Sequence, residues 1–240
     1  MQSTDTMVRE MMHKRYRRRR TLLVSAVAGI VVVAAALIGA GVVRANNQAP
    51  GPAPSHRPAG ASPDKAGLTI STGKVRVDLY LDYLCPECRR TELALASEQQ
   101  ALAAGGNASV VFHPVAFLDD HSRPKGYSTR AAAAAACAAD QGKFEQYSAV
   151  LFERQPAEQG PGLSAAQLVA AGRAAGITGN AFARCVEEAR YAPWVNYVSD
   201  VGASHQVTVT PTVMVDGHRI DVTGSDPAAA LEHAVTRARQ

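Results

Sequence analysis

Two cysteines at the junction between a strand-like run and a helix-like run constrain this chain more than any other feature. Residues 75–84 are apolar and strand-like, Cys85 and Cys88 follow at once, and residues 89–104 are helix-like. Cysteines at this spacing can form a disulfide, and a helix start offers the first of them unpaired backbone N–H groups and the positive end of the helix dipole. Both favour the thiolate, which is the reactive form of cysteine. The pattern therefore predicts a redox-active dithiol.

A structural zinc site is the main alternative for such a pair. It would need two further Cys or His ligands at matching spacing. The other two cysteines, Cys137 and Cys185, stand alone in alanine-rich helical stretches, and no histidine lies within five residues of either. We therefore expect redox chemistry at Cys85 and Cys88, with no metal ion and no other cofactor.

The first fifth of the chain has the pattern of a membrane anchor. Residues 1–20 hold seven Arg and Lys against two Asp and Glu, and residues 21–43 form a run of 23 uncharged, mostly apolar residues. At about 1.5 Å per residue, a helix of this length crosses the hydrocarbon layer of a bilayer. Only Arg44 follows directly, so the positive-inside rule predicts a basic cytoplasmic tail over residues 1–20 and an extracytoplasmic remainder.

A cleaved signal peptide is the alternative for this segment. Its apolar core usually spans roughly 7 to 15 residues, which is shorter than the run observed. We therefore expect a single retained signal-anchor helix over residues 21–43 and a protein of the cell membrane. Residues 67–240 carry fifteen basic against eighteen acidic residues. The basic cluster at the start is thus explained by topology and by attraction to anionic lipid, and no nucleic-acid partner is expected.

Residues 44–67 are rich in Pro, Gly, Ala, Ser and Asn. Such a segment buries too little apolar surface to fold alone, so it predicts a disordered linker that holds the following domain away from the bilayer. The remaining residues, 68–240, are expected to form one folded domain.

The periodicity of this domain predicts an α/β fold. Residues 74–81 alternate between apolar and polar side chains, residues 89–104 are helical, and residues 109–115 form a second strand, which together make a β-α-β unit. From about residue 128 to 200 the pattern is helical throughout. Two further strands follow at residues 212–215 and 219–222 around an Asp216-Gly217 turn, and a last helix starts at Asp226-Pro227.

The number of cysteines is even, and an extracytoplasmic setting lets disulfides persist. Pairing Cys85 with Cys88 leaves Cys137 with Cys185, which predicts a structural disulfide inside the helical insertion. Two buried free thiols acting as small apolar residues are the alternative.

Taken in order, several short stretches resemble one known family. They are CPEC after a strand, Asp82 three positions before it, HPVAFL at residues 113–118, GKF at 142–144, LFERQP at 151–156, and Thr210-Pro211-Thr212 before the hairpin. In this order, over residues 68–240, the chain resembles the DsbA-like thiol:disulfide oxidoreductases of the thioredoxin superfamily, of the membrane-anchored actinobacterial type. The resemblance implies a thioredoxin fold, written as β-α-β, helical insertion and β-β-α.

The resemblance also implies roles for site residues. Cys85 is expected to be the exposed, attacked sulfur and Cys88 the resolving one. Pro211 is expected to be cis beside the dithiol, which leaves the backbone at Thr210 free to pair with a substrate peptide. The alternative for this pair is a trans proline at the start of an edge strand. Between the cysteines, Pro86 and Glu87 are expected to shape the site.

How oxidising such a site is depends on the stability of the Cys85 thiolate. The helix start favours the thiolate, and Arg89 and Arg90 are expected to help, whereas the negative charge of Glu87 opposes it. We therefore expect a moderate oxidant.

One position departs from the family pattern. Many relatives place a buried acidic residue six positions before the first cysteine, and here that position is Leu79. Asp78 faces the opposite side of the strand. Asp82, nearer the site, is a candidate for part of this proton transfer, with a simply solvated carboxylate as the alternative, so the proton relay stays unassigned from sequence. His113 and His121 are expected to be packing or surface residues.

The function that follows is an extracytoplasmic, monomeric oxidase that introduces disulfides into reduced exported proteins. The resemblance implies reoxidation by a quinone-linked membrane oxidase of the vitamin K epoxide reductase type. A membrane-tethered reductase or isomerase of the same fold is one alternative, and a non-catalytic redox sensor or interaction module is another.

Overall fold

The computed structural model describes residues 50–240, and a five-stranded sheet runs through them in the order β1-β3-β2-β4-β5. The strands are β1 (Leu68–Thr69), β2 (Val75–Leu81), β3 (Ala108–Pro114), β4 (Thr212–Val215) and β5 (His218–Ile220). β2 pairs with β3 in parallel, and the other three pairings are antiparallel. Six of the seven residues of the central strand β2 are buried, as expected for a strand covered on both faces.

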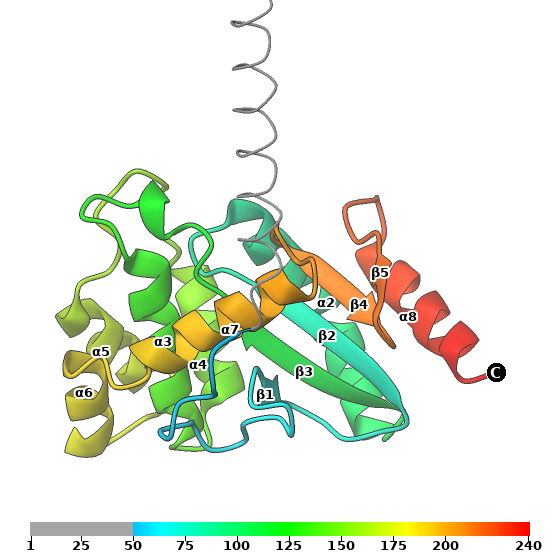
Figure 1. Ribbon diagram of the computed structural model, residues 1–240, viewed down its shortest axis with the longest axis horizontal. Coiled ribbons are helices and arrows are strands. Elements are labelled where there is room, and N and C mark those ends of the chain that lie inside the picture. The colour runs from blue at the N-terminus through cyan, green and yellow to red at the C-terminus, as the bar shows by residue number, and fades with distance from the viewer. Residues whose placement is uncertain (1–49) are drawn as a thin grey trace, which may run out of the picture. The chain divides into compact units, whose positions relative to one another are not determined.

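Helices cover both faces of this sheet (Figure 1). α2 (Pro86–Ala104) and α8 (Pro227–Ala238) pack together on one face, and α7 (Ala192–Ser204) lies across the other. A short 3-10 turn, η1 (Asp119–His121), precedes the helical insertion. The insertion continues through α3 (Tyr127–Ala139), α4 (Phe144–Glu153), α5 (Ala165–Ala174) and α6 (Asn180–Glu187) into α7. From β2 onward this order confirms the predicted succession of β-α-β, helical insertion and β-β-α, whereas β1, which pairs with β3, was not predicted. The insertion begins and ends within a few residues of the predicted bounds of 128 and 200.

The ends of two helices follow directly from their sequences. Cys85 is the N-cap of α2, and Pro86 occupies its first turn, where a missing N–H costs nothing. Asp226 caps α8 by accepting a hydrogen bond from the backbone N–H of Ala229 at 2.9 Å, with Pro227 again in the first turn. The helix start that carries the dithiol is therefore defined by local sequence.

The linker predicted for residues 44–67 ends earlier than expected. The backbone N–H of Ala59 donates to the carboxylate of Asp140 at 2.9 Å, and the indole N–H of Trp194 donates to the carbonyl of Lys65 at 2.8 Å. These partners lie 81 and 129 positions along the chain, so the composition of the segment alone could not reveal them. The last part of the predicted linker, from Ala59 onward, thus belongs to the folded domain.

The predicted cytoplasmic tail, the predicted membrane helix over residues 21–43 and the first residues of the linker lie outside the described residues. Within residues 50–240, no helix combines the length and the apolar character needed to cross a membrane.

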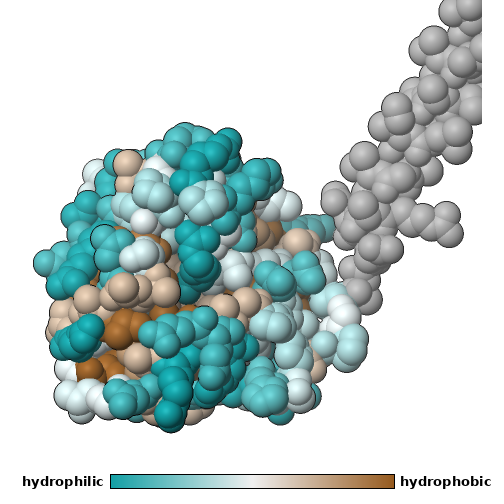
Figure 2. All heavy atoms as spheres, turned by 90° about the vertical axis from the view of Figure 1, so that its left-hand side faces the viewer, coloured by the Kyte–Doolittle hydropathy of each residue, from teal (hydrophilic) through white to brown (hydrophobic). Residues whose placement is uncertain are grey.

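The core of the described domain is continuous from the sheet into the insertion. Its largest fully buried side chains include Trp194, Tyr83, Tyr147 and Phe152. The alanine-rich helix α3 is buried along nearly its whole length, because small side chains let neighbouring helices approach closely. The face shown in Figure 2 is mostly hydrophilic, with hydrophobic areas gathered in its lower part.

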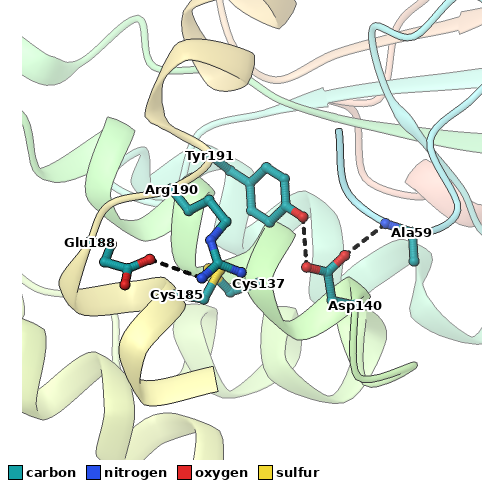
Figure 3. Close-up of a disulfide and its surroundings, with 7 residues drawn as sticks. All are labelled: Ala59, Cys137, Asp140, Cys185, Glu188, Arg190 and Tyr191. Carbon is teal, nitrogen blue, oxygen red and sulfur yellow. Dashed lines mark hydrogen bonds and ion pairs between the residues drawn. A yellow bond between two sulfur atoms is a disulfide. The ribbon is translucent and has the colours of Figure 1, made fainter. Parts of the chain in front are cut away.

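A disulfide joins α3 to α6 inside the insertion. Cys137 and Cys185, the pair left after matching the dithiol, are bonded with their Cα atoms 5.9 Å apart, and both side chains are buried. Beside this bond the carboxylate of Asp140 accepts hydrogen bonds from the hydroxyl of Tyr191 at 2.6 Å and from the N–H of Ala59 (Figure 3). The end of α3 is therefore tied both to the start of α7 and to the N-terminal segment.

Replacing both Cys137 and Cys185 by serine will lower the free energy of unfolding by about 2–4 kcal/mol, because the bond restricts the unfolded chain. The two cysteines lie 48 positions apart, so the loop that the bond closes is long. Urea unfolding followed by circular dichroism measures the change. Cys85→Ser is the matched control, because that thiol is free in this structure. If the urea-unfolding curves of the double variant and the control had the same midpoint and the same slope, the prediction would be wrong.

Candidate active site

The two cysteines of the CPEC motif lie where β2 gives way to α2. The backbone N–H of Cys88 donates to Cys85 Sγ at 3.4 Å, so the first turn of the helix points a donor at this sulfur. Cys85 Sγ also lies 3.5 Å from the carbonyl oxygen of Thr210. Cys88 Sγ in turn accepts a hydrogen bond from the backbone N–H of Asp82 at 3.4 Å. Both thiols are free, and the arrangement holds them at one helix start.

Access to the two sulfurs differs less than expected. Cys85 keeps 5% of its surface exposed and Cys88 none. The resemblance implies an exposed Cys85, whereas the structure buries most of its surface. It is still the more accessible of the two sulfurs.

The two thiols differ more strongly in acidity. The Cys88 thiol donates a hydrogen bond to Cys85 Sγ, and together with the Cys88 N–H this lowers the pKa of Cys85 to about 7. Burial raises the pKa of Cys88, and the neighbouring Cys85 raises it further. Near neutral pH the pair therefore carries its negative charge on Cys85.

The charges that act on Cys85 are not those expected from sequence. The carboxylate of Glu87 forms an ion pair with Arg90 at the surface, where both side chains are more than half exposed. The carboxylate that opposes the Cys85 thiolate is instead that of Asp82. Solvent screens a surface pair far more than it screens a buried carboxylate, which explains the difference.

Asp82 is fully buried, and its carboxylate is bonded to its own turn and to two distant segments. Its carboxylate accepts hydrogen bonds from the N–H of Leu84 at 2.9 Å, from the N–H of Leu118 at 2.9 Å and from the hydroxyl of Ser128 at 2.7 Å. Burial outweighs these bonds and raises the pKa of Asp82 to about 6. A carboxyl group of this acidity can exchange protons near neutral pH, and the backbone N–H of the same residue contacts Cys88 Sγ.

The loop before β4 completes the site. The Thr210-Pro211 peptide bond is cis, and the Thr210 carbonyl lies beside Cys85 Sγ although 125 positions separate the two residues. Val209, just before them, is 51% exposed and places an apolar side chain at the edge of the site. The dithiol, the proline loop and Asp82 are thus brought together by the tertiary fold.

The remaining sequence candidates lie elsewhere. Leu79 is fully buried. On the opposite side of the strand, the Asp78 carboxylate contacts the ring of His113 at 2.8 Å. His121 lies at the surface beside Glu158. The two histidines therefore have the packing and surface roles expected of them.

Two polar contacts at the site were not predicted from sequence. Ser128, at the start of α3, donates to Asp82, and the side-chain amide of Gln155, just after α4, donates to the carbonyls of Tyr83 and Cys85. Gln155 belongs to the LFERQP stretch, which contributed to the family resemblance. The stretch alone does not show which groups the Gln155 side chain contacts. Within residues 50–240, no cluster of three or more His, Cys, Asp or Glu side chains is placed to hold a metal ion.

Comparisons with known proteins agree with this geometry. A family model described as thioredoxin matches residues 71–234. The reduced form of the disulfide bond oxidoreductase DsbG from Mycobacterium tuberculosis is 30% identical, with a TM-score of 0.62 over 75% of this chain and 90% of that one. Oxidised DsbA from the same organism is also 30% identical, with a TM-score of 0.60 over 70% of this chain and 90% of that one.

Two other similarities are more limited. The thiol-disulfide oxidoreductase MdbA from Actinomyces oris is 20% identical with a TM-score of 0.62, covering 80% of this chain and 97% of that one, which shows a shared fold. The serine/threonine-protein kinase PknE from Mycobacterium tuberculosis is 35% identical over 78 residues, 32% of this chain. That segment spans only 14% of the kinase.

Proposed function

This chain belongs to the thioredoxin family and is a DsbA-like thiol:disulfide oxidoreductase, and on that basis we propose that it works as an extracytoplasmic oxidase that introduces disulfides into exported proteins. The observation that carries the proposal is the asymmetry of the dithiol. Cys85 is the more accessible and more acidic sulfur, while Cys88 is fully buried and its pKa is raised. Thiol–disulfide exchange through Cys85 needs this division, because the sulfur that the first substrate thiolate attacks is also the leaving group when the second substrate thiolate releases the product.

The reaction starts from the Cys85–Cys88 disulfide of the oxidised enzyme. A substrate thiolate attacks Cys85 Sγ, the bond to Cys88 breaks, and Cys88 leaves as a thiolate that takes up a proton. Asp82, whose backbone already contacts Cys88 Sγ, is the proposed proton donor. The second substrate thiolate then attacks the substrate sulfur of the mixed disulfide and expels the Cys85 thiolate. Two electrons pass from substrate to enzyme, and the substrate leaves with a new disulfide.

The proline loop is the proposed place for the substrate. A peptide lying along Val209 and Thr210 would bring its cysteine to Cys85, whose sulfur is 3.5 Å from the Thr210 carbonyl. Backbone hydrogen bonding of this kind depends little on the side chains of the bound peptide, so many exported proteins could be substrates. The apolar surface of Val209 favours an unfolded segment over a folded polar surface.

The membrane tether supplies the setting of this proposal. The uncharged run over residues 21–43, with basic residues before it, supports a single-pass anchor that leaves the catalytic domain outside the cytoplasm. A quinone-linked membrane oxidase of the vitamin K epoxide reductase type is the proposed reoxidant, since a reduced dithiol on a tether reaches an integral membrane partner without diffusing through solution.

A reductase is the second candidate, and one observation favours it. The pKa of Cys85, about 7, is close to the value typical of thioredoxin and lies well above the roughly 3.5 of a strong oxidant such as DsbA. A less stabilised thiolate makes a weaker oxidant.

The direction of electron flow is tested by two measurements on the full chain. The first is the equilibrium of the Cys85–Cys88 pair with glutathione, and the second is the redox state of the protein trapped by acid quenching in cells. An oxidase is expected to be mostly oxidised in cells and to form a disulfide in a reduced test protein. A mostly reduced pool that reduces the same test protein would overturn the oxidase in favour of the reductase.

A further inference from the structure

The side chain of Gln155 reaches from the helical insertion to the active-site turn. Its amide nitrogen lies 3.1 Å from the carbonyl oxygen of Tyr83 and 2.9 Å from that of Cys85. Both partners are acceptors, so only the NH₂ end of the amide can bond them, and it uses its two hydrogens to do so. Gln155 lies 70 positions from Cys85 along the chain.

The helix before Gln155 is itself attached to the same turn. The hydroxyl of Tyr83 donates to Ser148 Oγ at 3.0 Å, and the rings of Tyr83 and Phe152 lie 4.8 Å apart, all on buried surface. Ser148 and Phe152 belong to α4, so the position of Gln155 relative to the turn is set by packing. Its amide is therefore presented to the two carbonyls in a fixed direction.

The carbonyl of Cys85 has a direct influence on the sulfur. It accepts both the N–H of Arg89, at 3.3 Å, and the amide of Gln155. The direction of this carbonyl is coupled to the backbone angle ψ of Cys85, which is 116°. That angle determines where the first turn of α2, including the N–H of Cys88, lies relative to Cys85 Sγ. The donors of Gln155 also offset the negative end of a carbonyl dipole that belongs to the reacting residue.

We propose that Gln155 is a positioning residue for thiol exchange, which holds the Tyr83 and Cys85 carbonyls so that Cys85 Sγ remains aligned with the N–H of Cys88. Through Gln155, the acidity of the Cys85 thiol depends on a contact made by the helical insertion. This inference rests on the proposed role of Cys85, but a thiol titration reads it without any disulfide transfer.

The test measures the rate of Cys85 alkylation by iodoacetamide as a function of pH in the reduced full chain, with the modified cysteine identified by mass spectrometry. Gln155→Leu removes both donors at similar volume. It is expected to raise the apparent pKa of Cys85 by about 0.5–1 unit, a roughly three- to tenfold smaller thiolate fraction below pH 7. The equilibrium constant for oxidation of glutathione should fall by a similar factor, since both report on the thiolate. The charged group that acts on Cys85 is Asp82, and it is unchanged in this variant.

Two further variants make the result specific. Gln146→Leu is the matched control, because Gln146 is an exposed glutamine on the adjoining α4, and its titration should equal that of the wild type. Gln155→Glu keeps the shape but faces two carbonyls with a carboxylate, so it should raise the pKa of Cys85 more than Gln155→Leu does. A merely structural role would lower the melting temperature and leave the titration of the folded protein unchanged, and that outcome overturns the inference. Failure of the wild type to transfer disulfides, with the titration shift present, would reject the proposed function and leave the role of Gln155 standing.

Discussion

Replacing Cys85 by serine will reduce disulfide transfer to a reduced test protein by roughly a thousandfold or more, because no other described thiol is free and accessible to attack. The measurement is the rate at which disulfides form in reduced ribonuclease. The fold should persist, since serine at an N-cap position retains an oxygen that accepts a helix N–H. Unchanged transfer by a folded Cys85→Ser variant would reject the enzyme and favour a redox sensor or interaction module.

Cys88→Ser is the companion variant. Its Cys85 can still attack a disulfide, but no resolving thiol remains, so a mixed disulfide with the partner should accumulate. Trapping it identifies which sulfur is attacked, because only a bond through Cys85 agrees with the greater accessibility and acidity of that residue. A trapped species joined through Cys137 or Cys185 would contradict the assignment of those two residues to a buried disulfide.

Asp82→Asn will slow disulfide transfer by about a hundredfold near neutral pH, if the carboxyl group protonates the Cys88 thiolate. The pH dependence of the rate separates this role from a structural one. The wild type should show an inflection near pH 6, matching the raised pKa of Asp82, and the variant should lack it. A lower rate with the inflection retained would assign the proton transfer to another group.

Asp82 is also expected to make the folded protein less stable as the pH rises. The pKa of Asp82 is raised by burial to about 6 in the folded state, against about 3.9 for an unfolded aspartate. The folded state therefore binds the proton more tightly, and the contribution of this group to the free energy of unfolding falls as the pH rises from about 4 to about 6. Between pH 4 and pH 7 the wild type should lose about 2–3 kcal/mol more stability than Asp82→Asn, because the other titrating groups contribute equally to both proteins; urea unfolding at the two pH values measures this difference.

The order of helices and strands was predictable because each element is encoded by nearby residues. The alternation along residues 74–81, the Asp216-Gly217 turn and the Asp226-Pro227 helix start each need only a few neighbours to be recognised. The same holds for the dithiol, whose two sulfurs and helix start lie within four residues of one another.

Other properties of the site depend on burial, which the local sequence does not reveal. The charge opposing the Cys85 thiolate was assigned to Glu87 from proximity along the chain, whereas the structure assigns it to Asp82. Glu87 is nearer in sequence but lies in solvent with Arg90, and solvent screens its effect. Sequence distance was therefore a poor guide to electrostatic influence, because burial decides how far a charge acts.

The N-terminal segment shows the same limit. Its Pro- and Gly-rich composition correctly indicates that it cannot fold alone, yet from Ala59 onward it is held by side chains of Asp140 and Trp194. The composition of a segment indicates whether it can fold alone. It does not reveal hydrogen bonds to residues of the helical insertion.

By itself, the amino-acid sequence determined that this chain carries a redox dithiol at a helix start, in a β-α-β unit followed by a helical insertion and a β-β-α unit. These properties are local, since backbone periodicity, caps and cysteine spacing act over a few residues. Only the tertiary structure decided which groups surround the sulfurs. The Thr210 carbonyl, the Ser128 hydroxyl bonded to Asp82, and the amide of Gln155 reach the active-site turn because hydrophobic packing brings distant segments together, and no short-range pattern records those contacts.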